Sequence, residues 1–269
     1  MLPSFDLYFP LPTARFPHDM QDELCQRVVS DPEVTTRSLA PGARLSPFMA
    51  DSFAVVVEGA LAVELLSGDG EPTILEVLGP GDCVPHWEPS SPSRIPIAMR
   101  ALVPSLFAKV PLKAFDRIMR NEPSLASVLG SKLAQQHAEL LARLAEAAQR
   151  SALQRVSAAI DYLARKVGEK CPLAPGVRIS LSQAEIARVA NHTRQTANDI
   201  LTQLEAAGLV RAERSMLCVL DRELVGAVAG GENLRAAWKP AKTCKLLHPD
   251  EPLTCHPLRR AAPSRAKNS

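Results

Sequence analysis

The chain has 269 residues, of which 46% are hydrophobic, 22% charged and 4% aromatic, enough apolar residues for the cores of two ordinary domains. Its 31 basic and 29 acidic residues leave a net charge of +2, which by itself does not predict nucleic-acid binding. No apolar run approaches the roughly 18 residues of a membrane span, the first residues lack a secretion signal, and the six cysteines are too scattered to predict a disulfide framework. We therefore expect a cytoplasmic protein of two domains.

Residues 1–20 include four prolines and predict an irregular arm. Short β-branched stretches follow, separated by turns that contain glycine. Strands at such close spacing are typical of an antiparallel sandwich or jelly roll rather than of a parallel sheet. The clearest predicted strands are residues 53–59, 60–66 and 72–78, within a β-rich domain expected over residues 21–112.

After Pro111 the hydrophobic pattern changes to the period of a helix, which we expect over residues 113–150. One stripe of this helix has the alternating spacing of 4 and 3 residues that characterises a coiled-coil seam. Packing against the sheet of the same chain is one way to cover the stripe, but a parallel helix pair in a homodimer is favoured. The seam consists of Leu133, His137, Leu140, Leu144 and Ala147, with His137 interpreted as a packing residue.

A further helix is expected over residues 151–167, and residues 181–205 then predict two short helices joined by about three residues. Ser182 and Glu185 have the spacing of a capping box, and Thr193 can cap the second helix. Two helices joined so closely describe a helix-turn-helix, and residues 209–220 add two strands that form a wing. A plain helical hairpin in a structural bundle is the alternative.

The second helix of this pair carries polar side chains near its N-terminus, the end that enters a DNA major groove. Amide groups at helix N-termini and the hydroxyl groups beside them suit phosphate oxygens. We therefore expect contacts with double-stranded DNA from Ser182, Gln183, Thr193, Arg194, Gln195, Thr196, Asn198 and Asp199.

In this order, a β-rich domain, a long helix and a winged helix-turn-helix resemble the Crp/Fnr family of bacterial transcription regulators. The similarity is carried by residues 57–63, 79–82, 185–187, 193–196 and 200–205. It implies an α+β fold with a jelly-roll (double-stranded β-helix) sensor over residues 21–112, a dimerisation helix over 113–150 and a winged DNA-binding domain over 151–225. It also implies a homodimer that binds a palindromic operator under the control of an effector, with RNA polymerase as a further partner.

Members of this family that bind cyclic nucleotides hold the ribose with a Glu, the phosphate with an Arg and the adenine with a Thr-Ser pair. The positions that resemble these carry His86, Arg94 followed by Ile-Pro, and Leu140 with Leu141. Four prolines within residues 85–96 also remove amide donors that a phosphate would use. We therefore expect no cyclic-nucleotide binding and an unidentified effector, in a candidate pocket formed by Cys83, His86, Arg94, Leu140 and Leu141.

Haem is the alternative cofactor, because Cys83 and His86 share a segment where some haem-binding relatives place their ligands. An iron–sulfur cluster is not expected, because only Cys25 precedes residue 80. Near the C-terminal end, four residues could supply ligands to zinc: Cys244, His248, Cys255 and His256. Their spacing matches no common zinc finger, so no metal ion is expected there either.

Residues 230–269 contain eight basic and three acidic residues, so they carry +5 and the rest of the chain −3. With five prolines, this composition predicts a mostly disordered tail over residues 226–269 that is either solubilising or attractive to phosphate. No hydrolase, phosphate-loop or zinc-protease motif is found, and we expect no enzyme. The alternative to a DNA-binding regulator is a haem- or small-molecule-binding sensor that acts through protein contacts.

Overall fold

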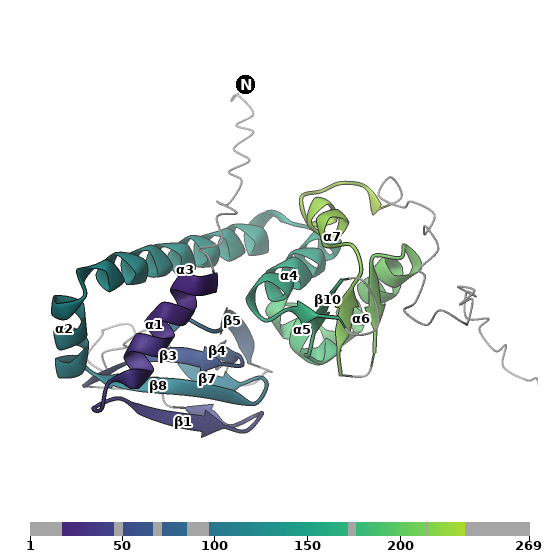
Figure 1. The fold of residues 1–269 in the computed structure, drawn as a ribbon. Helices are drawn as coiled ribbons and strands as arrows, with labels where there is room; N and C mark the ends of the chain where they lie inside the picture. Colours follow the sequence, from purple (N-terminus) through teal and green to yellow (C-terminus); the bar gives the residue numbers. More distant parts are fainter. Residues whose placement is uncertain are drawn as a thin grey trace, which may run out of the picture.

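The computed structural model describes residues 18–45, 51–66, 72–84, 97–171, 176–213 and 215–234. The long helix α3 (Pro123–Gln149) runs along a β-rich body and leads into a smaller, mainly helical body (Figure 1). The predicted arm up to residue 17 and the chain beyond residue 234 lie outside the described residues.

The β-rich body consists of two antiparallel sheets with strand orders β1-β8-β3-β6 and β2-β7-β4-β5. Large apolar side chains from both sheets, among them Leu61, Leu78 and Phe107, fill the space between them. The predicted jelly-roll fold class is thereby confirmed. The strands are β1 (Thr35–Leu39), β2 (Arg44–Leu45), β3 (Ser52–Glu58), β4 (Leu61–Leu65), β5 (Thr73–Leu78), β6 (Cys83–Val84), β7 (Ile97–Ala101) and β8 (Ser105–Pro111).

The three clearest predicted strands are confirmed as β3, β4 and β5, with ends that differ by at most one residue. Gly59 makes the turn between β3 and β4 with a φ of 83°. A Cβ atom at this position would lie 2.4 Å from the carbonyl oxygen of Pro104. Both the left-handed backbone and the close approach therefore require glycine.

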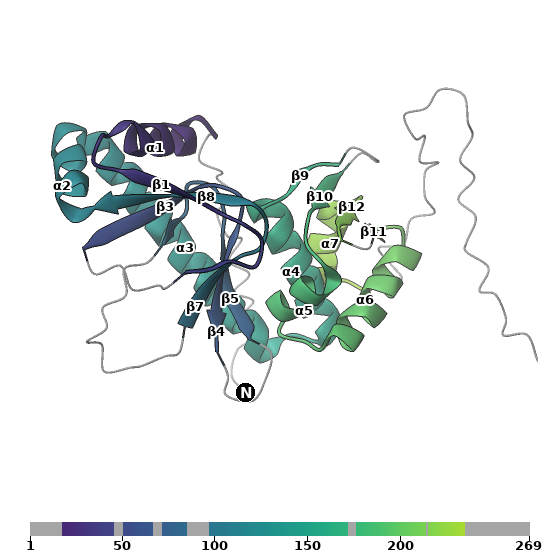
Figure 2. The same cartoon turned by 90° about the horizontal axis from the view of Figure 1, so that it is seen from below.

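Helix α1 (His18–Ser30) precedes the first strand, where the sequence analysis expected an irregular arm followed directly by strands. Over residues 24–30, where its side chains are described, only Leu24 and Val28 are buried, which is too short a pattern to predict a helix. Both side chains pack with Ala108 and Val110 of β8, on the face of that sheet turned away from the other sheet. Figure 2 shows α1 lying across this face.

Residues 113–150, predicted as one helix, contain the end of α2 (Leu112–Asn121) and all of α3. The break falls at Glu122, whose φ of −133° and ψ of 77° are not helical. Pro123 causes it, because proline disfavours helical geometry in the residue before it yet fits the first position of a helix. Although α3 is long, no helix in the described part of the chain has both the length and the apolarity to cross a membrane.

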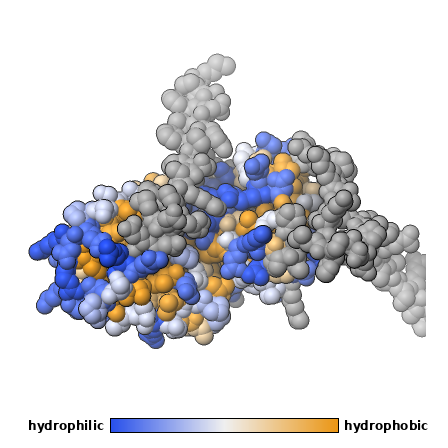
Figure 3. All heavy atoms as spheres, in the orientation of Figure 1, coloured by the Kyte–Doolittle hydropathy of each residue, from blue (hydrophilic) through white to orange (hydrophobic). Residues whose placement is uncertain are grey.

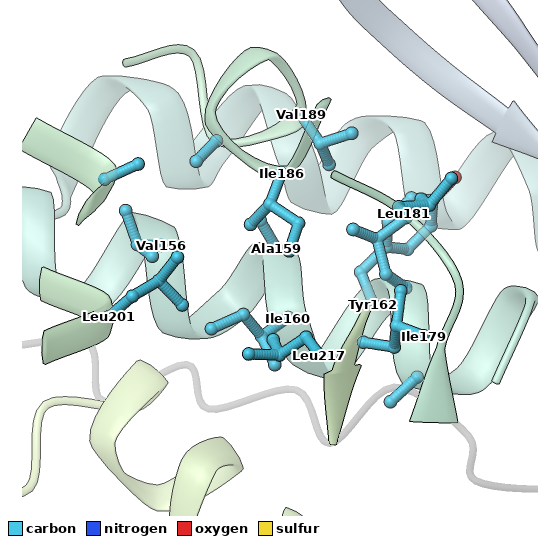
Figure 4. Packing of buried hydrophobic residues seen from close by; sticks show 14 of the residues in the cluster. Val156, Ala159, Ile160, Tyr162, Ile179, Leu181, Ile186, Val189, Leu201 and Leu217 are labelled. Atoms are coloured by element: carbon cyan, nitrogen blue, oxygen red, sulfur yellow. The ribbon is translucent and has the colours of Figure 1, made fainter. Parts of the chain in front are cut away.

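The second body contains α4 (Ala152–Lys166), α5 (Gln183–Val189), α6 (Arg194–Ala206) and α7 (Arg222–Ala229). Ser151 caps α4 in a reciprocal capping box with Gln154. Val156, Ile160 and Leu201 meet in the core of this body (Figure 4). Its antiparallel sheet has the order β11-β12-β10-β9, with strands β9 (Glu169–Lys170), β10 (Val177–Ile179), β11 (Val210–Ala212) and β12 (Leu217–Val219).

The two bodies share one apolar core. Ile74 and Val77 of β5 belong to the same buried cluster as Tyr162 of α4 and Val189 of α5. Strand β5 also lies beside α4 and α5 in space (Figure 2). The helical body is therefore docked directly on the edge of the β-rich body.

Candidate nucleic-acid interface

Helices α5 and α6 form the predicted helix-turn-helix, with a tight turn between them. Asn191 adopts a left-handed conformation (φ 52°), which Asn tolerates better than most residues. The amide of His192 donates to the carbonyl of Ala187 at 2.9 Å and closes the turn onto α5. The buried faces of both helices then fix how they cross, with Ile186, Ala187 and Val189 from α5 and Ala197, Ile200, Leu201 and Leu204 from α6.

Both helices are capped by the residues that the sequence indicates. The Ser182 hydroxyl accepts from the amide of Glu185 at 3.3 Å, and the Thr193 hydroxyl accepts from the amide of Thr196 at 3.2 Å. The predicted capping box at α5 is only half formed, however. The carboxylate of Glu185 accepts from the Ser182 hydroxyl and from Arg100 of β7, at 3.2 Å and 2.9 Å, because Arg100 offers it a charged partner.

The N-terminal half of α6 presents its predicted DNA-contacting side chains on one surface. Arg194, Gln195 and Asp199 are exposed, and the Gln195 amide donates to the Asp199 carboxylate at 3.0 Å. Asn198 is half-buried, and among the described residues its side-chain oxygen has no hydrogen-bond partner. Ser182, Gln183 and Thr196 are half-buried and Thr193 is exposed. The structure therefore groups residues 193–199 around the start of α6, and places Ser182 and Gln183 at the start of α5.

One further residue beside this surface was not singled out from the sequence. Arg211 lies on β11 of the wing, with a half-exposed side chain whose Nε is 3.4 Å from Glu213. An arginine on a wing strand next to a helix-turn-helix suits a DNA phosphate. The signal in the sequence was weak, because a single arginine on a surface strand is common and Arg211 belongs to no motif.

The helical body is held on the β-rich body through the free edge of β5. The Tyr162 hydroxyl donates to the carbonyl of Val77 at 3.0 Å and accepts from its amide at 2.9 Å. The Arg143 guanidinium donates to the carbonyls of Ile74 and Val189, at 3.0 Å and 2.8 Å, and stacks 4.8 Å from the centre of the Tyr162 ring. Side chains from α3 and α4 thus satisfy backbone groups that an edge strand leaves unpaired.

A buried charge cluster joins the turn before β6 to α3 and α4. Asp82, only 1% exposed, forms an ion pair with Lys132 of α3 at 2.9 Å and accepts a hydrogen bond from Lys166 of α4 at 2.7 Å. Lys166 also reaches Glu139 of α3 at 2.8 Å. Burial alone would lower the pKa of Lys166, but the attraction of Asp82 raises it above its usual value. Lys166 therefore keeps its charge, and the cluster links three elements of the two bodies.

Two further polar contacts tie α3 and α5 to the sheets. Gln136 of α3 accepts from the amide of Cys83 at 3.1 Å and donates to its carbonyl at 3.2 Å. Arg100 of β7 bridges Glu64, which is fully buried in β4, and Glu185 of α5, at 2.7 Å and 2.9 Å. The helix-turn-helix is thus bonded directly to a strand of the β-rich body.

The candidate effector pocket is described only in part. His86 and Arg94 lie outside the described residues. Cys83 is buried among side chains of α1, on the opposite face of β6 from Val84, and burial raises the pKa of its thiol to about 12. Haem ligation therefore gains no support, because iron binds the thiolate. Leu140 is half-buried and Leu141 is exposed, so the pocket residues that are described lie in different environments.

The predicted seam lies on the outer face of α3. Leu133 and Leu144 are 44% and 59% exposed, and Leu141, which was assigned to the pocket, is 53% exposed beside them. His137 and Ala147 are exposed and Leu140 is half-buried. No described segment of the chain covers these leucines, whereas hydrophilic side chains gather at the α2 end of the molecule (Figure 3).

Two family models match the chain. One, for the Crp-like helix-turn-helix domain, matches residues 138–225, and the other, for the cyclic nucleotide-binding domain, matches residues 49–122. Together they span most of both bodies and part of α3. No curated protein matches the sequence significantly.

Solved structures of regulators share this fold. A CRP/FNR-family transcriptional regulator from Thermus thermophilus has a TM-score of 0.59 and 19% identity, over 74% of this chain and 100% of that one. FixK2 from Bradyrhizobium japonicum has a TM-score of 0.59 and 20% identity, over 74% of this chain and 99% of its own. The c-di-GMP responsive global regulator CLP from Xanthomonas campestris has a TM-score of 0.58 and 16% identity, over 74% of this chain and 98% of its own.

Proposed function

The chain belongs to the Crp/Fnr family of transcription regulators, and from that premise we propose that it binds a palindromic operator as a homodimer under the control of an effector. The observation that carries the proposal is the exposed polar start of α6, held on a fully apolar inner face. A recognition helix needs this combination, because its base-reading side chains must be free while its own position is rigid.

The side chains on α6 support a specific pattern of base reading. Arg194 is exposed and suits the O6 and N7 atoms of guanine, a bidentate contact worth roughly 1–3 kcal/mol of discrimination. Gln195 donates to Asp199, which leaves its amide oxygen and one N–H for the N6 and N7 atoms of adenine. Thr193, Ser182 and Arg211 are suited to phosphate contacts that set the register of the complex.

The outer face of α3 supports the homodimer. Leu133, Leu141 and Leu144 form an apolar stripe on an exposed helix, and such a stripe is typical of an interface. A second copy that pairs through the same stripe by a two-fold axis covers it on both chains. Two recognition helices related by this axis match the two halves of a palindrome.

Control by an effector is supported by the docking of the helix-turn-helix on the β-rich body. Arg100, Tyr162 and Lys166 connect the two bodies through buried contacts, so a shift of β5 or β7 repositions α5 and α6. Cyclic nucleotides remain disfavoured as the effector, because Leu140 and Leu141 offer no hydroxyl for an adenine. A regulator of this kind acts in the cytoplasm, beside RNA polymerase.

Selection from random DNA duplexes tests the proposal, with wild-type protein and with Arg194→Ala. We expect the wild type to enrich a palindrome, and the variant to lose its preference at one base pair of each half-site. Arg120→Ala is the matched control, because Arg120 is an exposed arginine of α2 that lies far from α6 in the fold. If the wild type and Arg194→Ala enrich the same motif with equal sharpness, Arg194 does not read bases.

A further inference from the structure

Two cysteines of the helical body lie in contact. The sulfur atoms of Cys171 and Cys218 are 2.6 Å apart, and both residues are buried, with exposures of 4% and 1%. Cys171 directly follows β9, Cys218 is the middle residue of β12, and Leu220 packs against the pair. No disulfide bond joins the two thiols in this structure.

The position of the pair in the chain matters more than the contact itself. The two cysteines are 47 positions apart, and the segment between them contains β10, α5, α6 and β11. A bond between the two sulfurs would therefore close the whole helix-turn-helix and one strand of its wing into a single covalent loop. Among the described cysteines, no other pair closes so short a loop around this segment, because Cys25 and Cys83 lie much earlier in the chain.

We propose that Cys171 and Cys218 are a reversible redox pair, in which a peroxide converts the two thiols to a disulfide that locks the helix-turn-helix. In the first step one sulfur attacks a peroxide oxygen, the O–O bond breaks, and a sulfenic acid and water form. In the second step the other sulfur attacks the sulfenic sulfur, the S–S bond forms, and a second water leaves. The two thiols lose two electrons and two protons, and the peroxide is reduced; a dithiol reductant reverses the change.

The backbone around the pair is already placed for this bond. The amide of Cys171 donates to the carbonyl of Gly176 at 3.1 Å, which closes the β9–β10 hairpin, and β12 is paired on both sides, with β10 and β11. Gly176 approaches β12 so closely that a Cβ atom would lie 2.2 Å from the carbonyl oxygen of Val219. We therefore expect α6 to keep its position when the disulfide forms.

Either sulfur can begin this sequence, and the other then resolves the sulfenic acid. Burial, together with the contact to Cys171, raises the pKa of the Cys218 thiol to about 11, and the thiolate is the reactive form. Because both residues are buried, we expect the reaction to take minutes or longer.

The experiment treats the full chain with hydrogen peroxide, alkylates the remaining thiols, and maps the peptides by mass spectrometry. We expect a linked peptide that joins Cys171 to Cys218, and a melting temperature higher by roughly 5–15 °C, because the loop restricts the unfolded chain. Dithiothreitol should remove both, and affinity for the selected operator should change by less than about threefold, since α6 does not move.

The variants Cys171→Ser and Cys218→Ala should lose the linked peptide and the shift in melting temperature, whereas Cys25→Ser should keep both. Serine is used at Cys171 and alanine at Cys218, so that the test does not depend on a single type of replacement at a buried site. The proposal is overturned if other cysteines are linked instead, if Cys171 only reaches a sulfinic acid, or if the Cys171 and Cys218 variants respond like the wild type. The linked peptide and the melting shift do not depend on DNA binding, so their failure is distinguishable from a failure of the proposed operator.

Discussion

From Lys132 onward, beyond the buried Leu125 and Leu129, the two faces of α3 reverse the distribution of residues that is usual for a helix at a protein surface. Its inner face buries Lys132 and Gln136, each only 7% exposed, whereas its outer face leaves Leu141 and Leu144 more than half exposed. A surface helix of a single chain normally turns its leucines inward. The reversal indicates that the helix serves two interfaces, one within the chain and one outside it.

The inner face is polar because it has to select one arrangement of the two bodies. Apolar side chains pack in many registers, but Lys132 requires the carboxylate of Asp82, and Gln136 requires the backbone of Cys83. A buried polar group without its partner costs more than a lost contact, so wrong dockings are penalised. The outer face needs no such selection if two identical helices meet along a two-fold axis.

The largest effect is expected on the outer face. Leu141→Glu combined with Leu144→Glu places four carboxylates along the proposed two-fold seam and leaves the inner face unchanged. We expect a folded monomer in sedimentation and a loss of operator affinity of roughly 100-fold or more, because each half-site must then bind alone. Ser124→Glu combined with Ala126→Glu, at exposed positions near the start of α3, is the matched control and should remain dimeric. A dimer that persists in the leucine variant would show that the two copies meet elsewhere.

A smaller effect, now on stability, is expected from the inner face. Asp82→Asn removes the carboxylate that Lys132 and Lys166 share at a buried site. We expect a loss of about 3–5 kcal/mol in the free energy of unfolding, because Lys132 and Lys166 both lose a buried carboxylate and Lys166 keeps only Glu139. Urea denaturation measures it. Asp116→Asn, which breaks an exposed pair on α2, should cost less than about 1 kcal/mol. Equal losses in the two variants would contradict the role of the cluster.

The smallest effect concerns Glu76 of β5, which accepts from Gln136 at 3.3 Å. Burial raises its pKa above the usual 4.5, although Gln136 and Lys166 oppose this. The folded state then holds the proton more tightly than the unfolded state. Glu76 therefore imposes no penalty below about pH 4.5, and its penalty grows as the pH rises through the raised pKa.

Glu76→Gln removes that charge and keeps an acceptor for Gln136. We expect it to stabilise the protein at pH 7 by a small amount, within about 0.5 kcal/mol, and to have no such effect at pH 4. Unfolding curves at the two pH values measure the difference. A variant that is less stable at pH 7 would show that the charge on Glu76 contributes favourably to the inner face.

Much of the local structure could be predicted from sequence, where a strong pattern within a few residues decides it. The β-branched runs of β3 to β5, the cap at Thr193 and the apolar spacing of α6 each depend on neighbours in the chain. The exposed polar start of α6 followed from the same spacing, because residues that alternate with a buried stripe must face outward. Helix α1 was missed because Leu24 and Val28, the buried residues among its described side chains, form too short a pattern to stand out.

Only the tertiary structure decided which partners distant residues take. Ser182 and Glu185 have the spacing of a capping box, yet Glu185 binds Arg100, which is 85 positions away in the chain. Asp82 with Lys166, Tyr162 with Val77 and Cys171 with Cys218 are likewise brought together by docking rather than by sequence spacing. A polar residue gains similar energy from a partner nearby in the chain and from one far away, so the sequence pattern does not tell which partner it takes. The fold decides, because it excludes water from one of the two contacts and leaves the other exposed to solvent.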